Sequence, residues 1–449
     1  MPKTGLSRRK FVATPAAASA VAVSAPYVHG AYAAGTLSMG FWDHWVPGAN
    51  DTLTKLVKEW GEKEKVETKI DYITSIGEKN QLTIAAEAQA KSGHDILQHP
   101  TWFPAAYAEQ LEPVDDLMAK LIADNGKVSS VVEYLGKVKG KWVAIPATTG
   151  SQVKNPCARI DLFKQHVGWD PREMYPAGAD PKKEMTDKWT WDEFLRAAQA
   201  CHKAGFPFGM PLGTTTDAVD WVGAVFAAHG AQLFDEKGNI KVKSDETKMV
   251  LEWFKKLVPN LPPEVFAWDD AGNNKWLIAG KGALIMNPPS AWAVAKRDNV
   301  KVAEQCWFFD APKGPKGRFA PGLPYYWAIW NFSPNKTAAK SLLTFLSQRS
   351  SVEQLVQASG GYDIPSFAKF NDFKTWAEEA PPKGTQYNYP PKHDQVVSIA
   401  CSPAPPKIAN QAYTQATLTK MVAKCTQQGE SIDKTIAWAE QELEGFLRT

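Results

Sequence analysis

Strand and helix patterns alternate along the first part of the chain after residue 35. The strand patterns have apolar residues at every second position or in short runs, and the helix patterns have them at helical spacing. Strands are expected at 36–42, 68–73 and 95–98, and helices from Asp51 and at 81–90. This alternation is typical of α/β folds with parallel strands. In such folds ligands bind beyond the carboxyl ends of the strands.

Aromatic and polar side chains follow two of these strand ends. They are Trp42, Asp43, His44 and Trp45 after the first strand, and Gln98, His99 and Trp102 after the third. A small-molecule pocket needs aromatic platforms and converging polar groups, and these residues provide both. Successive residues of a strand point to opposite faces, so we expect only some of them to reach a ligand. Packing at the strand ends is the alternative interpretation.

The N-terminal segment has the composition of an export signal. Lys3, Arg8, Arg9 and Lys10 precede an apolar run over 11–23, and Ala31-Tyr32-Ala33 resembles a cleavage site. The run around Arg8 and Arg9 matches the twin-arginine pattern. The apolar run is shorter than the ~20 residues of a membrane-spanning helix. We expect residues 1–33 to be removed and the mature protein to diffuse freely in the periplasm; a plain basic N-terminus or a membrane anchor is the alternative.

Charge and cysteine content exclude several classes of partner. The full chain has 51 basic and 48 acidic residues, and four of the basic ones lie in the signal. The mature part is therefore almost neutral, which gives no reason to expect nucleic acid or an anionic membrane as a partner. The cysteines are too scattered for a metal site, although a bridge between Cys401 and Cys425 stays open: Cys157, Cys201, Cys306, Cys401, Cys425.

Tryptophan is unusually frequent, with 18 residues against 12 tyrosines. Some of these side chains are expected in the core. An excess in an exported protein also favours flat apolar platforms for a ligand with a C–H face and hydroxyl edges, such as a sugar ring.

A chain of 449 residues is long enough for two cores, since single cores stop growing near ~250–300 residues. We expect a hairpin at Gly140, a helix capped by Thr190 and Glu193, and a surface insertion over 169–188. Further strands are expected at 281–286 and 325–330, and further helices at 220–229, 245–258 and 273–279. Crossings between the two units are expected at 145–148, 287–290 and 332–335.

Several short segments together resemble the family 1 extracellular solute-binding proteins. They occur in the same order and at similar spacing over nearly the whole mature chain. The segments are Trp42-Asp43-His44-Trp45, His94-Asp95-Ile96-Leu97, 140–146, 190–194, 230–238, 276–286 and Gly360-Gly361-Tyr362-Asp363-Ile364-Pro365.

This resemblance implies an α/β, two-lobed periplasmic-binding-protein fold with three inter-lobe crossings. The N-terminal lobe would comprise 34–145 plus 288–332, and the C-terminal lobe 146–287 plus 333–449. The protein would be a monomeric, cofactor-free, non-enzymatic component of an ABC importer. It would bind a sugar or sugar-like polyol between the lobes and deliver it to the permease subunits in the membrane.

Further contact residues are suggested in the second half of the chain. Ser290 and Trp292 match the place where this family presents a small polar residue and a tryptophan to its ligand. Tyr325 or Tyr326 could donate a hydroxyl to the ligand. Trp268 and Asp269 could supply a platform and a carboxylate, but capping of a following helix explains Asp269 equally well.

Two other functions remain as alternatives. An exported enzyme would suit the twin-arginine signal, but HExxH, GxSxG and CxxC are all absent from the sequence. Gly280-Lys281 is not a P-loop, because Lys275 stands where the first glycine is required. A ferric-ion-binding importer component would use Tyr325 and Tyr326, but strand alternation would turn these two rings apart.

Overall fold

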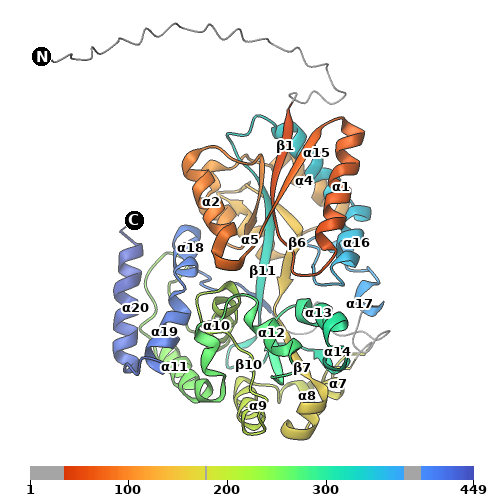
Figure 1. The fold of residues 1–449 in the computed structure, drawn as a ribbon. Helices are drawn as coiled ribbons and strands as arrows, with labels where there is room; N and C mark the ends of the chain where they lie inside the picture. The colour runs from red at the N-terminus through yellow and green to blue at the C-terminus, as the bar shows by residue number, and fades with distance from the viewer. Residues whose placement is uncertain (1–34, 177–178, 379–395, 449) are drawn as a thin grey trace, which may run out of the picture.

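The computed structural model describes residues 35–176, 179–378 and 396–448, and Figure 1 shows that they form two lobes, one above the other. The expected export signal lies outside the described residues. The helices of the described part are too short or too polar to cross a membrane.

The largest sheet is mixed and lies mostly in the upper lobe; its order is β10-β11-β3-β1-β2, β6 and β12 also pair with β11, and β10 lies at its lower end. The pairs β1–β2 and β1–β3 are parallel, as predicted, whereas β11 is antiparallel to β3 and β6. The strands of this sheet are β1 (Thr36–Trp42), β2 (Glu67–Ile73), β3 (Ile96–Pro100), β6 (Ile145–Val153), β10 (Lys313–Gly314), β11 (Gly317–Ile329) and β12 (Val396–Ser398).

Helices cover this sheet on both sides. The apolar face of α1 (Leu53, Leu56, Val57 and Trp60) is buried, as its helical spacing requires. A short hairpin, β4 (Lys137–Val138) with β5 (Lys141–Trp142), turns at Gly140, as predicted. The helices are α1 (Ala49–Glu64), α2 (Lys79–Ala90), α3 (Phe103–Ala106), α4 (Asp115–Asn125), α5 (Ser130–Gly136), α15 (Lys336–Leu346) and α16 (Arg349–Ala358).

The lower lobe has a small antiparallel sheet with the order β8-β7-β9, surrounded by helices. Its strands are β7 (Pro156–Arg159), β8 (Leu284–Met286) and β9 (Cys306–Phe308). The side chain of Thr190 accepts from the amide of Glu193, so the predicted cap of α9 is confirmed. The helices are α6 (Ile160–Leu162), α7 (Pro171–Met174), α8 (Lys183–Thr186), α9 (Trp191–Lys203), α10 (Thr216–His229), α11 (Asp245–Leu257), α12 (Gly272–Ile278), α13 (Ser290–Asp298) and α14 (Val300–Ala303).

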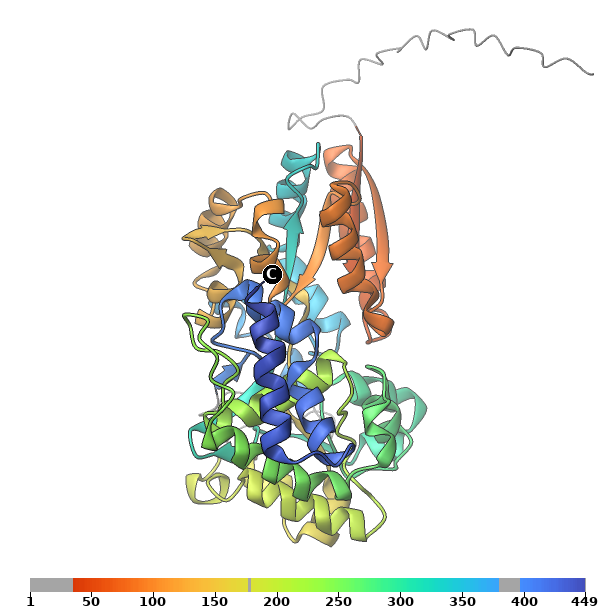
Figure 2. The same ribbon diagram turned by 90° about the vertical axis from the view of Figure 1, so that its left-hand side faces the viewer.

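The C-terminal helices α18 (Pro406–Thr414), α19 (Thr417–Thr426) and α20 (Ile432–Phe446) lie against the side of the lower lobe (Figure 2). α19 contacts α10 and α11, and α18 also reaches α3 of the upper lobe. The short helix α17 (Thr375–Glu378) precedes them. Trp102 Nε1 donates to the carbonyl of Ala400 at 2.9 Å, which adds a bond between the two lobes on this side.

The first crossing lies on β6, where it was expected, but the other two crossings between the lobes differ from the expected ones. The chain leaves the upper lobe along β6 and returns along β11, the long strand in the centre of Figure 1. Residues 288–314 stay with the lower lobe, because β9 pairs with β7 and α13 packs against α12 and α14. α15 and α16 belong to the upper lobe, since both pack on α1. The third crossing therefore follows α16 and not residues 332–335.

The structure also corrects two smaller predictions. The segment 169–188 is a surface insertion only in part: Tyr175 is fully buried and its carbonyl accepts from Trp307 Nε1 at 3.0 Å, whereas residues 179–184 are mostly exposed. All five cysteines are buried free thiols, so the bridge between Cys401 and Cys425 does not form.

Candidate functional site

A small pocket lies where the two lobes meet. The upper lobe lines it with residues at the ends of β1 and β2, on β6 and β11 and after α16, and the lower lobe with residues on or near α10, α12 and α13. These residues are Trp42, Trp45, Ser75, Gln152, Leu323, Tyr325 and Tyr362 from the upper lobe, and Thr216, Asp217, Asp270, Asn274, Asn287 and Ser290 from the lower. The volume open to the centre of a water molecule is only about 10 Å³, which is room for about one water.

The upper wall of the pocket is aromatic. Trp42 stacks on Tyr362 with ring centroids 6.0 Å apart, and the ring centroid of Tyr325 lies 5.4 Å from that of Trp42. The backbone of Gly150 passes close to both Trp42 and Tyr325. The wall therefore consists of packed rings with little freedom to move.

Residues beside Trp42 hold this wall in place. Gln98 is fully buried: its Oε1 accepts from the Trp42 amide at 2.9 Å, and its Nε2 donates to the Thr149 carbonyl. His44 Nε2 lies 3.1 Å from Asp363 Oδ1, which also accepts from the Gly150 amide at 2.8 Å. Gln98 and His44 therefore lie behind Trp42 and do not line the pocket.

Several other predicted residues lie outside the pocket. Asp43 is exposed and accepts from Asn50 Nδ2 at 2.7 Å. His99 is fully buried beside Tyr107 and Trp330, and burial lowers the pKa of its imidazole to about 3. Trp102 bridges to Ala400, as described above. These residues pack the fold around β1 and β3.

The two adjacent tyrosines on β11, Tyr325 and Tyr326, pack in two different hydrophobic cores. Tyr325 lines the pocket, whereas the Tyr326 hydroxyl donates to the Val132 carbonyl at 3.0 Å on the opposite face of the sheet. This is the divergence that strand alternation predicts. Among the described residues, no group of three or more His, Cys, Asp or Glu is placed to hold a metal ion.

The predicted residues around α12 and α13 also separate. Trp268 packs against Trp276, with ring centroids 5.5 Å apart. Asp269 accepts from the Ala271 amide at 3.1 Å in the turn before α12, but no side chain caps this helix, so Asp269 is not its cap. Trp292 is buried, with the Lys296 ammonium 4.2 Å from its ring centroid, and it is not among the lining residues.

An ionic cluster lies beneath the lower wall. The Lys154 ammonium is fully buried and lies 2.7 Å from both Asp217 and Asp220. Asp220 also accepts from the Tyr413 hydroxyl at 2.9 Å, and Asp217 accepts from Asn273 Nδ2 at 3.0 Å. Burial lowers the pKa of Lys154, but the two carboxylates outweigh it and raise the pKa overall, so the ammonium stays charged.

Amide and hydroxyl groups line the pocket beside this cluster. Asn287 Nδ2 donates to Asn274 Oδ1, and Asn274 Nδ2 donates to Ser290 Oγ at 3.2 Å. The backbone N–H of Asn287 donates to the Asn155 carbonyl at 3.0 Å, which attaches these pocket residues to the lower sheet.

Three buried polar atoms of the pocket residues have no hydrogen-bond partner among the described residues. They are Trp42 Nε1, Gln152 Oε1 and Asp270 Oδ1. An unmet hydrogen bond on a buried group costs about 1–3 kcal/mol. The pocket therefore has one donor and two acceptors that a bound molecule would satisfy.

The sequence interpretation missed most of the polar lining: Gln152, Thr216, Asp217, Asp270, Asn274 and Asn287. Asp270 and Asn287 had a signal, since each lies within three residues of a predicted contact. Gln152 lies on a strand that crosses between the lobes, and Asp217 opens a helix; neither position has a local pattern that sets it apart.

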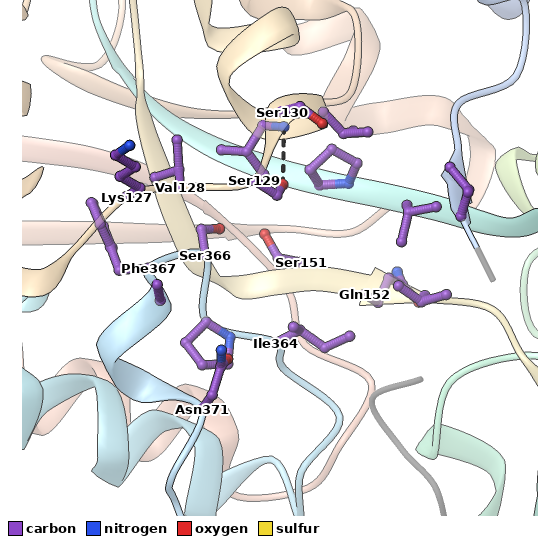
Figure 3. A pocket seen from close by; sticks show the side chains of 18 residues that line it. Lys127, Val128, Ser129, Ser130, Ser151, Gln152, Ile364, Ser366, Phe367 and Asn371 are labelled. Atoms are coloured by element: carbon purple, nitrogen blue, oxygen red, sulfur yellow. Dashed lines mark hydrogen bonds between the residues drawn. The ribbon is translucent and has the colours of Figure 1, made fainter. Parts of the chain in front are cut away.

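A second, more open pocket lies behind β6 on the upper lobe, with a volume of about 520 Å³ (Figure 3). Its walls include Ser129, Ser151 and Phe367, and Ser129 Oγ accepts from the Val132 amide as the cap of α5. Gln152 borders both pockets. None of the residues predicted from the sequence lines this second pocket.

Comparison with known proteins identifies relatives of this architecture. The sequence profile of the bacterial extracellular solute-binding protein family matches residues 55–382. T. maritima MalE3 with maltose bound has a TM-score of 0.72 at 18% identity, over 91% of this chain and 99% of that one. No curated protein matches the chain by sequence.

Two further solved structures have the same fold. A solute-binding protein from Thermotoga lettingae with α-D-tagatose bound has a TM-score of 0.73 at 16% identity, over 92% of this chain and 100% of that one. A sugar transporter from Arthrobacter chlorophenolicus with laminaribiose bound has a TM-score of 0.71 at 16% identity, over 92% and 99% of the two chains.

Proposed function

The chain belongs to the bacterial extracellular solute-binding protein family, and from this premise we propose that it binds a sugar or sugar-like polyol between its lobes and delivers it to an ABC permease. The proteins of similar fold named above hold maltose, tagatose and laminaribiose. The Thermotoga lettingae protein is a solute-binding protein, as are the members of the matched family.

The observation that carries this proposal is that both lobes contribute to one pocket with complementary chemistry. The upper lobe supplies the rings of Trp42, Tyr325 and Tyr362, and the lower lobe supplies Asp217, Asp270 and the Asn274–Asn287–Ser290 group. A sugar ring has an apolar C–H face, which packs on aromatic rings, and hydroxyl edges, which bond to amides and carboxylates.

Binding at this place couples the ligand to lobe closure. Only the closed arrangement brings both walls to the ligand, so a ligand shifts the population toward that arrangement. Moving the population from 1:99 to 99:1 requires about 5.5 kcal/mol of preference for the closed state. The closed surface would then be recognised by the permease.

Of the residues predicted from the sequence, Trp42, Trp45, Ser290 and Tyr325 are proposed as direct contacts. Gln98, His44 and Trp102 are proposed to position these contacts or the lobes. We further propose that residues 1–33 are a twin-arginine signal that is cleaved on export, and that the mature protein acts as a monomer without a cofactor.

Thermal unfolding of the mature protein from residue 34 tests the proposal. The panel contains mono- and disaccharides, polyols, amino acids and ferric ion. A ligand that binds only the folded state at a hundred times its Kd adds about 2.7 kcal/mol of stability and raises the Tm. We expect a rise with at least one carbohydrate and a smaller rise in Trp42→Ala. A rise with ferric ion alone, or with no member of the panel, contradicts the proposal.

A further inference from the structure

We propose that the sugar bound in this cleft carries a protonated amino group, which lies against Asp217 and Asp270. This inference rests on the proposed function and narrows its ligand to cationic carbohydrates. It starts from an imbalance of charge in the pocket between the lobes.

The lower wall has more carboxylates than cations. Asp217 and Asp270 line the pocket, and its lining residues include no lysine or arginine. Asp220 lies directly behind them, and Lys154 is shared between Asp217 and Asp220 at 2.7 Å to each. Asp269, the next carboxylate along the chain, is paired with Lys275 at 3.7 Å on the surface. One buried ammonium therefore faces three carboxylates, and Asp270 forms no ion pair with a lysine or arginine of the part of the chain that the structure describes.

Unmet acceptors in the same pocket point to a ligand with several donors. Gln152 is only 7% exposed, and its Oε1 has no donor among the described residues. Asp270 Oδ1 is buried and lacks a donor as well. A hydroxyl group has one proton to donate, whereas an ammonium group has three. An ammonium group can thus donate to more than one such acceptor while it neutralises the excess charge.

The aromatic wall favours the same kind of ligand. Trp42, Tyr325 and Tyr362 gather at the opposite side of the pocket. The faces of such rings attract cations by about 0.5–2 kcal/mol, and more so in a desolvated site. Phosphorylated polyols and acidic sugars would meet carboxylates with no arginine or lysine on the lining, so we expect them to be excluded.

The proton affinity of Asp270 agrees with this geometry. Burial, followed by the negative charge of Asp217, raises the pKa of Asp270 to about 7. The remaining charges that act on it are Lys154, which lowers its pKa, and Asp220 and Asp269, which raise it. Without a ligand, this carboxyl group takes up a proton near neutral pH. A bound ammonium group would replace that proton.

Matched sugar pairs test the inference in isothermal titration calorimetry on the mature protein. The probes are D-glucosamine with D-glucose and N-acetyl-D-glucosamine, the corresponding galactose set, and the glucosamine disaccharide with maltose and N,N′-diacetylchitobiose. We expect at least one amino sugar to bind at least tenfold more tightly than its neutral partners. Asp270→Asn should lower the affinity for that amino sugar at least tenfold more than it lowers the affinity for the neutral partner. Asp298→Asn, an exposed change of equal charge at the end of α13, should behave as the wild type.

Each other outcome has a defined meaning. If neutral sugars bind as tightly as their amino partners, or Asp270→Asn keeps full affinity for an amino sugar, the inference is overturned and the proposed function stands. Heat on addition of calcium alone, with neutral sugars bound and amino sugars not, also overturns it, because a metal ion would then meet the excess charge. If no carbohydrate binds, both the inference and the proposed function are wrong.

Discussion

Gly150 fixes the aromatic wall of the pocket. Its φ of +88° lies in the region that disfavours residues with a side chain, and a Cβ there would lie 2.9 Å from the Tyr325 ring and 3.2 Å from the Trp42 ring. Its amide also donates to Asp363. The position therefore requires glycine for its backbone conformation and for the close approach of two rings.

Gly150→Ala is expected to reduce both stability and sugar binding. The strained backbone costs about 1–3 kcal/mol, and displacement of the rings adds to this. Urea unfolding and sugar titration measure the two effects. Gly48→Ala is a matched control, because Gly48 has the same φ of +88° with nothing within 4 Å of the added carbon. Equal losses of stability in the two variants would show that the ring contacts at Gly150 do not matter.

At the scale of single residues, the sequence predicted the aromatic upper wall of the pocket better than its polar lower wall. Trp42, Trp45 and Tyr325 lie at strand ends or on a recognisable strand, so their type and place could be predicted. Most tryptophans, however, are buried in the core, and several of their indoles donate hydrogen bonds there, such as those of Trp189 and Trp221. Composition cannot separate these from a binding platform, because both uses bury the ring.

At the scale of elements, a hydrogen-bonded chain ties α2 to β2 and β11. His94 lies between Glu87 and Asp71, with its Nδ1 2.5 Å from Glu87 and its Nε2 3.1 Å from Asp71. Glu87 also accepts from Trp330 Nε1 at 2.9 Å. Burial lowers the pKa of His94, but its two carboxylate partners outweigh burial and raise the pKa overall.

This chain predicts a pH dependence of stability. A pKa raised on folding gives stability that is fully present below the unfolded value, about 6.5, and lost as pH rises through the folded value. We expect the free energy of unfolding to decrease from pH 6 to pH 8, with a smaller decrease in His94→Gln. His202→Gln, on the exposed side of α9, should keep the wild-type slope. A slope unchanged in His94→Gln would contradict the prediction.

Most elements could be predicted from periodicity and caps, but two of the three crossings between the lobes could not. β1 has the predicted bounds, and α10, α11 and α12 lie within a few residues of theirs. β11 was expected at 325–330 and begins at Gly317, because one strand continues from the lower lobe into the upper. The side-chain pattern of a strand does not change where the strand passes from one core to another, so the sequence contains no signal for the crossing.

At the scale of the whole molecule, the structure is closed around a pocket with room for about one water. A sugar can enter only when the lobes separate. On the side of α18, the Trp102–Ala400 bond and the packing of α3 on α18 tie the lobes together. We therefore expect the lobes to pivot on that side and to open at the pocket.

Small-angle X-ray scattering tests this motion. We expect the radius of gyration of the empty mature protein to exceed that of the sugar-bound protein, because closure brings the lobes together. A sugar that does not bind in calorimetry is the control and should leave the radius unchanged. Identical radii with and without a bound sugar would mean that the empty protein is already closed.

The two-lobed architecture itself could be predicted from chain length and spaced motifs, since these survive at low sequence identity. The assignment of 288–332 and 333–358 to lobes could not. It depends on the partners that β9, α15 and α16 find, and those partners lie more than 100 residues away along the chain.

The small volume of the closed pocket also limits the rate at which the protein can bind its sugar. If sugar binds the open form and the lobes then close around it, the observed loading rate rises with sugar concentration and then levels off at the rate of closure. The tryptophans of the wall would report this event by their fluorescence in a stopped-flow experiment. In a sugar-rich medium, the loading rate would then be limited by the motion of the lobes about their hinge and would no longer depend on the sugar concentration.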